Sequence, residues 1–330
     1  MFRNRWAAVV LALLAPVVAE LAFGSTPPRM AYLVLLWVPI YGAGVVLIRE
    51  SVRRVGGRWP SLVLLGVAYE IAEDGFGLQA LTSPHLYGPD AHWLRAAGLN
   101  LPYWAANAGY HVVFSVLVPI AVTELLFRRY GRRPYLGRVG LTGTGIVAVL
   151  GVALVRLTVP PSQDPGYQAP LPALAAFGAA IAALAVVALA VLPRLRPRVP
   201  TTRPPGPVVL AGFGAVATFA FLGVLLPFGA YLHSPLARGP LVAVPLSVGA
   251  LAALTAVGCL RRWALSETDA RWLIGGALVA HTALGAWRFG HDLPDVLAIA
   301  AIGALTLLPL VLAARRATAA GIPSPAPEAR

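Results

Sequence analysis

Ten apolar runs of membrane-spanning length follow one another along the 330 residues of this chain. A helix needs about 20 apolar residues to cross the hydrocarbon core of a bilayer, and it satisfies its backbone hydrogen bonds internally. The alternating strands of a membrane β-barrel are not recognisable in the sequence. We therefore expect an all-α fold, a polytopic transmembrane helical bundle of about ten spans. The expected spans are Trp6–Phe23, Ala31–Ile48, Ser61–Leu81, Trp104–Phe127, Leu141–Val159, Leu171–Leu192, Val208–Tyr231, Leu241–Leu260, Trp272–Trp287 and Val296–Leu312.

The distribution of basic residues predicts the orientation of these spans. All 26 basic residues are Arg, and positively charged loops of membrane proteins stay on the cytoplasmic side. With the N-terminus inside, 21 Arg fall in internal segments, four fall in external loops, and Arg156 lies within a span. We therefore expect both termini to be cytoplasmic, in a bacterial plasma membrane. The four external residues are Arg29, Arg95, Arg238 and Arg288.

The composition also narrows the possible partners. Charged residues make up 12% of the chain, against about 25% in soluble proteins, and 58% of the residues are hydrophobic. A net charge of +13 would favour nucleic-acid binding in a soluble domain, but here the Arg residues mark the loops. We expect the lipid bilayer as a partner and no nucleic acid, and the oligomeric state stays open. The single Cys259 excludes an intramolecular disulfide and a cysteine-based metal site.

An Arg- and Pro-rich segment divides the chain. Residues 1–193 form a first membrane half that carries the intramembrane acids, and residues 194–207 form a cytoplasmic linker. Residues 208–316 form the second membrane half, and residues 317–330 are expected to be a disordered tail. Five spans on each side of the linker would give the halves opposite orientations, as in many transporters. We found no matching motifs in the two halves.

Three acids within one apolar run are the best indication of function. Glu70, Glu73 and Asp74 lie in the third expected span, where each carboxylate costs about 2.5–3.5 kcal/mol at a helix centre. Their i, i+3, i+4 spacing predicts that all three project from one helix face. Because neighbouring carboxylates cannot all be ionised at low cost, we expect at least one to hold a proton. The cluster indicates a proton, cation or metal site; a buried hydrogen-bonded cluster that holds helices together is the alternative.

Two histidines and one arginine extend the candidate binding site. His111 and Asp74 each lie about seven residues from the external ends of their expected spans, at similar depth. His281 lies in the middle of the ninth span, and Arg156 is a candidate counter-ion for the acids or for an anionic substrate. Glu73, Asp74, His111 and His281 together would suit a divalent metal, although no cofactor is established by the sequence. Either His alone could equally be a helix–helix hydrogen-bonding residue.

The other acids near the spans lie close to span ends. Glu20, Glu50 and Glu124 can reach water there, and we expect them to be structural or topological residues.

Two resemblances accompany these residues. The block from Ile48 to Leu81, with His111 and the segment Pro134–Leu141, resembles an uncharacterised family of bacterial polytopic membrane proteins, which implies no particular activity. More distantly, Glu73-Asp74, His111 and His281 are similar to the acid pair and two histidines of the CAAX-protease and bacteriocin-processing family of intramembrane proteases. Leu78 stands where that family has Arg, Asn107 stands where it has Phe, and its second Glu is here Asp74.

Three functions follow from these features. The first is a transporter or permease whose acid cluster binds a proton or cation on the path of an unknown small molecule or ion. The second is an intramembrane hydrolase in which Glu73 activates a water and His111, with Asp74 or His281, holds a metal or an oxyanion. The third is a non-catalytic accessory or assembly subunit with structurally buried acids. We favour the transporter, and therefore a function other than enzymatic catalysis.

Overall fold

A computed structural model describes residues 4–87, 95–131, 133–196, 200–229 and 243–319. The described part is all-α apart from one short hairpin, and 79% of the structure is helical. Ten continuous helical stretches occupy the positions of the ten predicted spans. Five of them are long and apolar enough, by length and composition, to cross a membrane: Pro28–Arg54, Leu101–Leu126, Arg138–Gln163, Leu171–Arg194 and Leu293–Arg315.

The first four stretches combine α-helix with short π- or 3₁₀-helical segments, labelled η. They are α1 (Arg5–Pro16) with η1 (Val17–Leu21); η2 (Pro28–Leu33), α2 (Val34–Trp37), η3 (Val38–Gly42) and α3 (Ala43–Arg54); α4 (Trp59–Glu70) with η4 (Ile71–Gly77); and α5 (Leu101–Tyr110), η6 (His111–Leu117) and α6 (Val118–Leu126). The hairpin β1 (Arg95–Ala96) and β2 (Leu99–Asn100) directly precedes α5.

The other six stretches are more regular. They are α7 (Arg138–Gln163), which follows the 3₁₀ turn η7 (Arg128–Tyr130); α8 (Leu171–Val186) with η8 (Val187–Val191) and η9 (Leu192–Arg194); α9 (Pro207–Gly229); α10 (Ala243–Arg262); α11 (Glu267–Arg288); and α12 (Leu293–Ala319). Between η9 and α9, Thr202 pairs with Trp263 after α10, which ties the predicted linker to the next connection.

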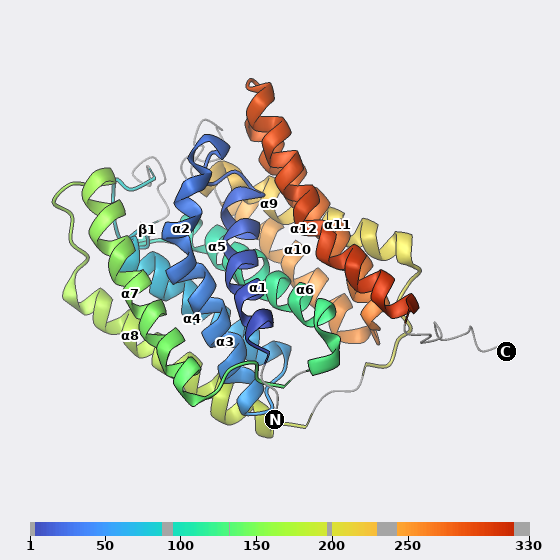
Figure 1. Ribbon diagram of the computed structural model, residues 1–330. Coiled ribbons are helices and arrows are strands. Elements are labelled where there is room, and N and C mark those ends of the chain that lie inside the picture. Colours follow the sequence, from blue (N-terminus) through green and yellow to red (C-terminus); the bar gives the residue numbers. More distant parts are fainter. Residues whose placement is uncertain (1–3, 88–94, 132, 197–199, 230–242, 320–330) are drawn as a thin grey trace.

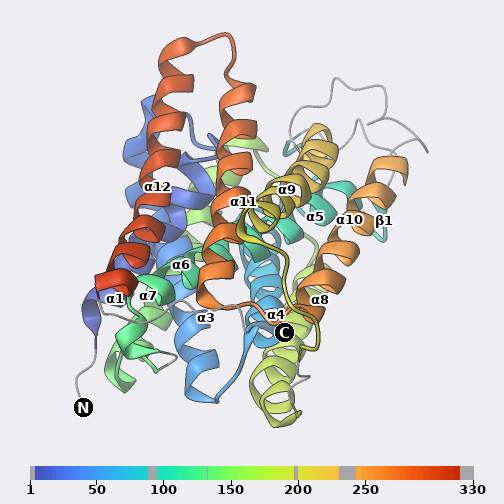
Figure 2. The ribbon, with the colours of Figure 1, turned by 90° about the vertical axis from the view of Figure 1, so that its right-hand side faces the viewer.

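Helices α1 to α6 form the centre of the molecule, between two flanking groups. Helix α7 packs against η3, α3 and η4, and α8 packs against α4 and η4, on one side (Figure 1). On the other side α9 contacts α5, α12 contacts α6 and η1, and α11 packs against both α9 and α12 (Figure 2). The central group is therefore covered from both flanks, and its interior is shielded from lipid.

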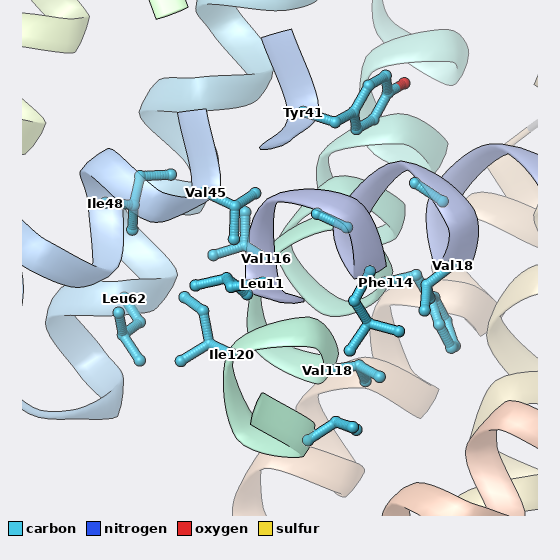
Figure 3. Packing of buried hydrophobic residues seen from close by; sticks show 14 of the residues in the cluster. Leu11, Val18, Tyr41, Val45, Ile48, Leu62, Phe114, Val116, Val118 and Ile120 are labelled. Carbon is cyan, nitrogen blue, oxygen red and sulfur yellow. The ribbon is translucent and has the colours of Figure 1, made fainter. Parts of the chain in front are cut away.

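The core of the central group is built from branched aliphatic side chains. Leu11 of the first stretch lies beside Val45 of α3 and Val116 and Ile120 of the fourth stretch, and Val18 belongs to the same cluster farther along, beside Phe114 (Figure 3). Tyr41 lies at the edge of this cluster, with its hydroxyl pointing away from the aliphatic side chains (Figure 3). The apolar core thus ends where a group of polar side chains begins.

Several boundaries differ from the predicted ones. The third stretch was expected to run from Ser61 to Leu81, but η4 ends at Gly77 because Gln79 adopts a left-handed backbone conformation with φ of 60°. Asp74 therefore lies close to the end of its helix rather than about seven residues inside it. At the other end of the chain, the predicted tail begins at residue 317, whereas α12 continues to Ala319; residues 320–330 lie outside the described part.

Candidate functional site

Four π-helical segments place polar side chains at one level of the central group. Glu20 lies in η1, Tyr41 in η3, Glu73 and Asp74 in η4, and His111 at the start of η6. In η4 the backbone N–H of Leu78 donates to Glu73 O, the i to i+5 pattern of a π-helix, at 2.7 Å. Such widened turns are rare and occur frequently at functional sites. Because four neighbouring helical stretches each have a π-helical segment here, this part of the central group is a candidate functional site.

His111 lies between the two acids of η4. Its Nδ1 is 3.5 Å from Glu73 Oε2, and its Nε2 is 3.8 Å from Asp74 Oδ2. Nδ1 also lies 3.0 Å from the hydroxyl oxygen of Ser115, one turn along the same helix. The structure therefore brings His111 beside Glu73 and Asp74, although Asp74 lies nearer its helix end than the seven residues that were predicted.

Aromatic hydroxyls surround these acids. Tyr103 donates to Asp74 Oδ1 at 3.2 Å, and Tyr41 donates to Glu20 Oε1 at 2.7 Å, whereas the Tyr69 hydroxyl has no hydrogen-bond partner among the described residues. The rings of Tyr41 and Tyr69 are each centred 6.0 Å from the His111 ring. Asp74 and Glu20 thus accept from neutral donors rather than from a positively charged partner.

Beside His111, two carboxylate oxygens nevertheless have no hydrogen-bond partner among the described residues. These are Glu73 Oε2 and Asp74 Oδ2, and the side chains that carry them are only 3% and 0% exposed. Glu70 Oε1 and Asp295 Oδ2, which lie outside the cavity at this site, also have none among the described residues. A buried acceptor without a partner is costly, so an unmatched pair at one place calls for an explanation. A bound proton, cation or ligand donor would satisfy both atoms.

Glu20 belongs to the same site, which the sequence analysis did not predict. Its Oε1 accepts from the Tyr41 hydroxyl at 2.7 Å, and its Oε2 accepts from Thr26 at 2.8 Å. Trp37 in turn donates to the Thr26 hydroxyl at 3.0 Å. The sequence predicts a structural or topological role for Glu20 because it lies three residues from the end of its expected span, Trp6–Phe23. A carboxylate flanked by Val17, Val18 and Leu21 was the signal available in the sequence.

A cavity of about 270 Å³ joins these groups. Glu20, Glu73, Asp74 and His111, here called the acid–histidine site, form part of its wall. Ser25, Thr26 and Tyr87 also line it, and they lie in connections at the predicted external ends of the helices. The remaining lining residues are Phe23, Trp37, Tyr41, Leu78, Tyr103, Asn107, Tyr110, Val155 and Arg288.

The third acid of the predicted cluster faces elsewhere. Glu70 Oε2 accepts from the indole N–H of Trp104 at 3.0 Å, and Glu70 is not among the described residues that line the cavity. We had expected all three acids on one helix face, from α-helical spacing. The backbone widens into a π-helix from Ile71 onward, which changes the angular relation between Glu70 and the two acids that follow it.

His281 and Arg156 also lie apart from the acids. The imidazole of His281 is fully buried, stacked on Phe114 at 4.2 Å and on Phe23 at 4.8 Å, with Nε2 3.1 Å from the Tyr110 hydroxyl. Because Tyr110 donates its single proton to Ala19 O, His281 Nε2 carries the proton of this bond.

Arg156 has other partners than the acids. It donates to Phe76 O at 3.0 Å and to Gln168 Oε1 at 2.7 Å. The structure therefore gives Arg156 no role as the counter-ion of the acid cluster within the described residues.

The four residues proposed as metal ligands are brought together only in part. Glu73, Asp74 and His111 are neighbours. The His281 ring is instead stacked on the Tyr110 ring, with ring centres 5.7 Å apart. Within the ranges that the structure describes, no group of three or more His, Cys, Asp or Glu side chains is arranged to hold a metal ion.

A second set of buried charges occupies the opposite, predicted cytoplasmic end of the central group. Arg53 makes a two-pronged contact with Glu124, at 2.8 and 2.9 Å, and Arg49 Nε lies 3.1 Å from the same carboxylate. Glu50 accepts from the backbone N–H groups of Tyr135 and Leu136 at 2.8 and 2.9 Å. Glu50 and Glu124 thus hold α3, α6 and the connection before α7 together.

Comparison with known proteins places the whole chain in one group. A family model described as an uncharacterized membrane protein family matches residues 9–318. No curated protein and no solved structure gives a significant match. The comparisons thus agree with the first resemblance drawn from the sequence and add no support to the likeness to intramembrane proteases.

Proposed function

The chain belongs to an uncharacterised family of membrane proteins, and we propose that it is a permease-like transporter of a bacterial plasma membrane. In this proposal ten spans cross the bilayer with both termini in the cytoplasm. The acid–histidine site binds a proton or a cation, and this binding is coupled to the movement of a small molecule or ion. Intramembrane ionisable groups that face a cavity are by default part of such pathways.

One observation carries the proposal. Carboxylates from two helical stretches and an imidazole from a third converge on a single cavity in the middle of the helical core. In this cavity Glu73 Oε2 and Asp74 Oδ2 face His111 and have no hydrogen-bond partner within the described residues, so both can accept from a bound ligand. A site that must release its proton or cation in every cycle retains such acceptors.

The two ends of the central group support a transport cycle. The cavity is lined by Ser25, Thr26 and Tyr87 toward the predicted external side, whereas Arg53 and Glu124 pair at the predicted cytoplasmic end. Alternating access requires a site that opens to one side while the other is closed. The helical stretch of η3 and α3 carries Tyr41 at the site and Arg53 in the ion network, so it connects both ends.

Proton-coupled flux in proteoliposomes tests the proposal. The purified full chain is reconstituted with an internal pH dye and an imposed pH gradient, and small cationic, zwitterionic, neutral and anionic metabolites are added outside. We expect at least one class to accelerate dissipation of the gradient, and Glu73→Gln to abolish this effect. Glu267→Gln, which neutralises an exposed acid far from the cavity, is the matched control. The same rate in protein-containing and empty liposomes for every class would overturn the transporter.

The position of His111 favours a second candidate, the intramembrane hydrolase. With Glu73 Oε2 3.5 Å from His111 Nδ1, the carboxylate is close enough to act as a general base for a water in the cavity while the imidazole acts as the acid. Such an enzyme would lose turnover in Glu73→Gln without any dependence on an ion gradient. A gradient-dependent flux therefore separates the two candidates.

A further inference from the structure

The cavity is walled by aromatic rings as much as by acids. Six aromatic side chains line it, contributed by the first four helical stretches and the connections that follow them. Tyr87 and Tyr103 are stacked with ring centres 5.7 Å apart, which presents a continuous aromatic surface near Asp74. The six residues are Phe23, Trp37, Tyr41, Tyr87, Tyr103 and Tyr110.

Carboxylates combined with aromatic faces recognise a particular class of ligand. The face of an aromatic ring carries negative electrostatic potential, so it attracts ammonium groups, and aromatic cages of this kind bind organic amines. An ammonium group also carries hydrogen-bond donors and no acceptor, which matches the unpartnered oxygens of Glu73 and Asp74. Both features of the wall therefore favour an organic cation.

The size and charge of the cavity exclude simpler occupants. A cavity of about 270 Å³ is far larger than a proton alone requires. A metal ion would need three or more suitably placed ligands, and the described residues offer no such group. An anion would meet three carboxyl groups and a single cation, Arg288, which lies over the Phe23 ring at 5.1 Å.

We propose that the cavity at the acid–histidine site binds a small organic amine in its ammonium form. The nitrogen would lie at Glu73 and Asp74, and the hydrocarbon part would pack against the aromatic side chains. This inference rests on the proposed transport function, because it names the substrate class of the same site. The amine would occupy the oxygens that now lack partners, and Tyr87 would cover it from the predicted external side.

Binding to the full chain in lipid nanodiscs tests the substrate class without any gradient. Four probes share one phenyl body and differ in charge: 2-phenylethylamine as the cation, 2-phenylethanol as the neutral analogue, phenylacetate as the anion and L-phenylalanine as the zwitterion. Isothermal titration at neutral pH, with empty nanodiscs as the blank, should detect the cation and give at least about tenfold weaker binding for the other three. Equal or tighter binding of any of the other three would overturn the assignment.

Variants locate the binding. Asp74→Asn and Glu73→Gln should each weaken 2-phenylethylamine binding by about tenfold or more. Glu267→Gln, which neutralises an exposed acid that does not line the cavity, is the control and should bind as the wild type does. Tyr87→Leu should weaken binding by about 2- to 30-fold, the range of one cation–π contact, whereas Tyr87→Phe keeps the ring and should not. Unchanged binding in both acid variants would overturn the site.

The outcomes of the two experiments are distinguishable. If the amine binds and no flux is found, the substrate class stands while transport fails. If a different metabolite class drives gradient dissipation and the amine does not bind, transport stands and the amine assignment fails. Should an acid variant not fold, as judged by gel filtration, the four-probe series on the wild type still decides the substrate class.

Discussion

The guanidinium carbon of Arg49 lies 3.3 Å from the centre of the Tyr135 ring, and both side chains are almost completely excluded from solvent. Arg49 also donates to Glu50 at 2.9 Å and to the Arg133 carbonyl at 3.2 Å. A cation stacked on an aromatic ring and bonded to a carboxylate holds the end of α3 against the connection before α7.

The ring of Tyr135, rather than its hydroxyl, should matter for stability. The hydroxyl is buried and has no hydrogen-bond partner among the described residues, so Tyr135→Phe should leave stability at neutral pH unchanged or slightly raised. Tyr135→Leu removes the ring from Arg49 and should cost about 0.5–2 kcal/mol. Thermal unfolding of the detergent-purified chain followed by tryptophan fluorescence measures both. A larger loss in Tyr135→Phe than in Tyr135→Leu would contradict the stacking.

The same tyrosine should make the protein sensitive to alkali. Burial raises the pKa of Tyr135 to about 12, although the charge of Arg49 opposes this shift. In the unfolded chain the phenol loses its proton near its ordinary value of about 10. The folded state therefore binds more protons than the unfolded state between these values, and stability falls as pH rises from about 10 to 12. The midpoint of Tyr135→Phe should decline less steeply than that of the wild type over this range, and identical slopes would argue against the shift.

Neutralising Glu124 should be much more damaging than neutralising an exposed acid. The change Glu124→Gln leaves the buried guanidinium groups of Arg49 and Arg53 without their shared carboxylate, which costs about 3–5 kcal/mol in comparable buried pairs. Glu267→Gln breaks an ion pair with Arg128 in which both side chains are at least one-third exposed, and it should cost about 0–1 kcal/mol. Thermal midpoints at one fixed heating rate compare the two, and equal losses would mean that the network contributes little.

A close approach of α7 to the site predicts the effect of one added methyl group. A Cβ on Gly151 would lie 2.6 Å from Ile40 N, inside the backbone of η3, so Gly151→Ala must displace the segment that carries Tyr41. Gly143→Ala in the same helix meets nothing within 4 Å and is the matched control. We expect Gly151→Ala to lower both the thermal midpoint and the binding of 2-phenylethylamine. If both variants have the thermal midpoint and the amine binding of the wild type, the close contact between η3 and α7 is not needed for stability or for binding.

The architecture and part of the site could be predicted from the sequence. Apolar length indicated ten helical stretches, because hydrophobic runs and charged loops are local features of a membrane protein. The sequence grouped His111 with Glu73 and Asp74 by chemistry and approximate depth, and the structure places His111 3.5 and 3.8 Å from these acids.

Other features depend on contacts between distant segments and could not be read from local patterns. The π-helical turns change the direction of Glu70, and no residue pattern in Ile71–Gly77 announces such a turn. Glu20 was not predicted as a site residue because it lies near a span end. Its partners Tyr41 and Thr26, 21 and six residues away in the sequence, hold its carboxylate at the cavity. The sequence grouped His281 with the acids only because His is a common metal ligand. In the structure its ring instead packs against Phe114.

His281 should therefore be replaceable where His111 is not. The change His281→Phe keeps an aromatic ring between Phe23 and Phe114 and removes only the bond to Tyr110, so amine binding should stay within about twofold of wild type. His111→Phe removes the polar group between Glu73 and Asp74, and binding should fall at least about tenfold. Loss of binding in a well-folded His281→Phe variant would place His281 in the site after all.

Metal content separates the transporter from a metal-dependent hydrolase most directly. Within the described residues only Glu73, Asp74 and His111 approach one another, the nearest separations are 3.5 and 3.8 Å, and they form no group suited to a metal ion. Because His111 turns a different ring nitrogen to each acid, one metal ion could not bind all three side chains through these two contacts. We therefore expect plasma mass spectrometry of the purified chain to find no stoichiometric transition metal, in wild type, Glu73→Gln and His111→Ala alike. Near-stoichiometric zinc that is lost in both variants would instead favour the hydrolase, with Glu73 and His111 as its metal-site residues.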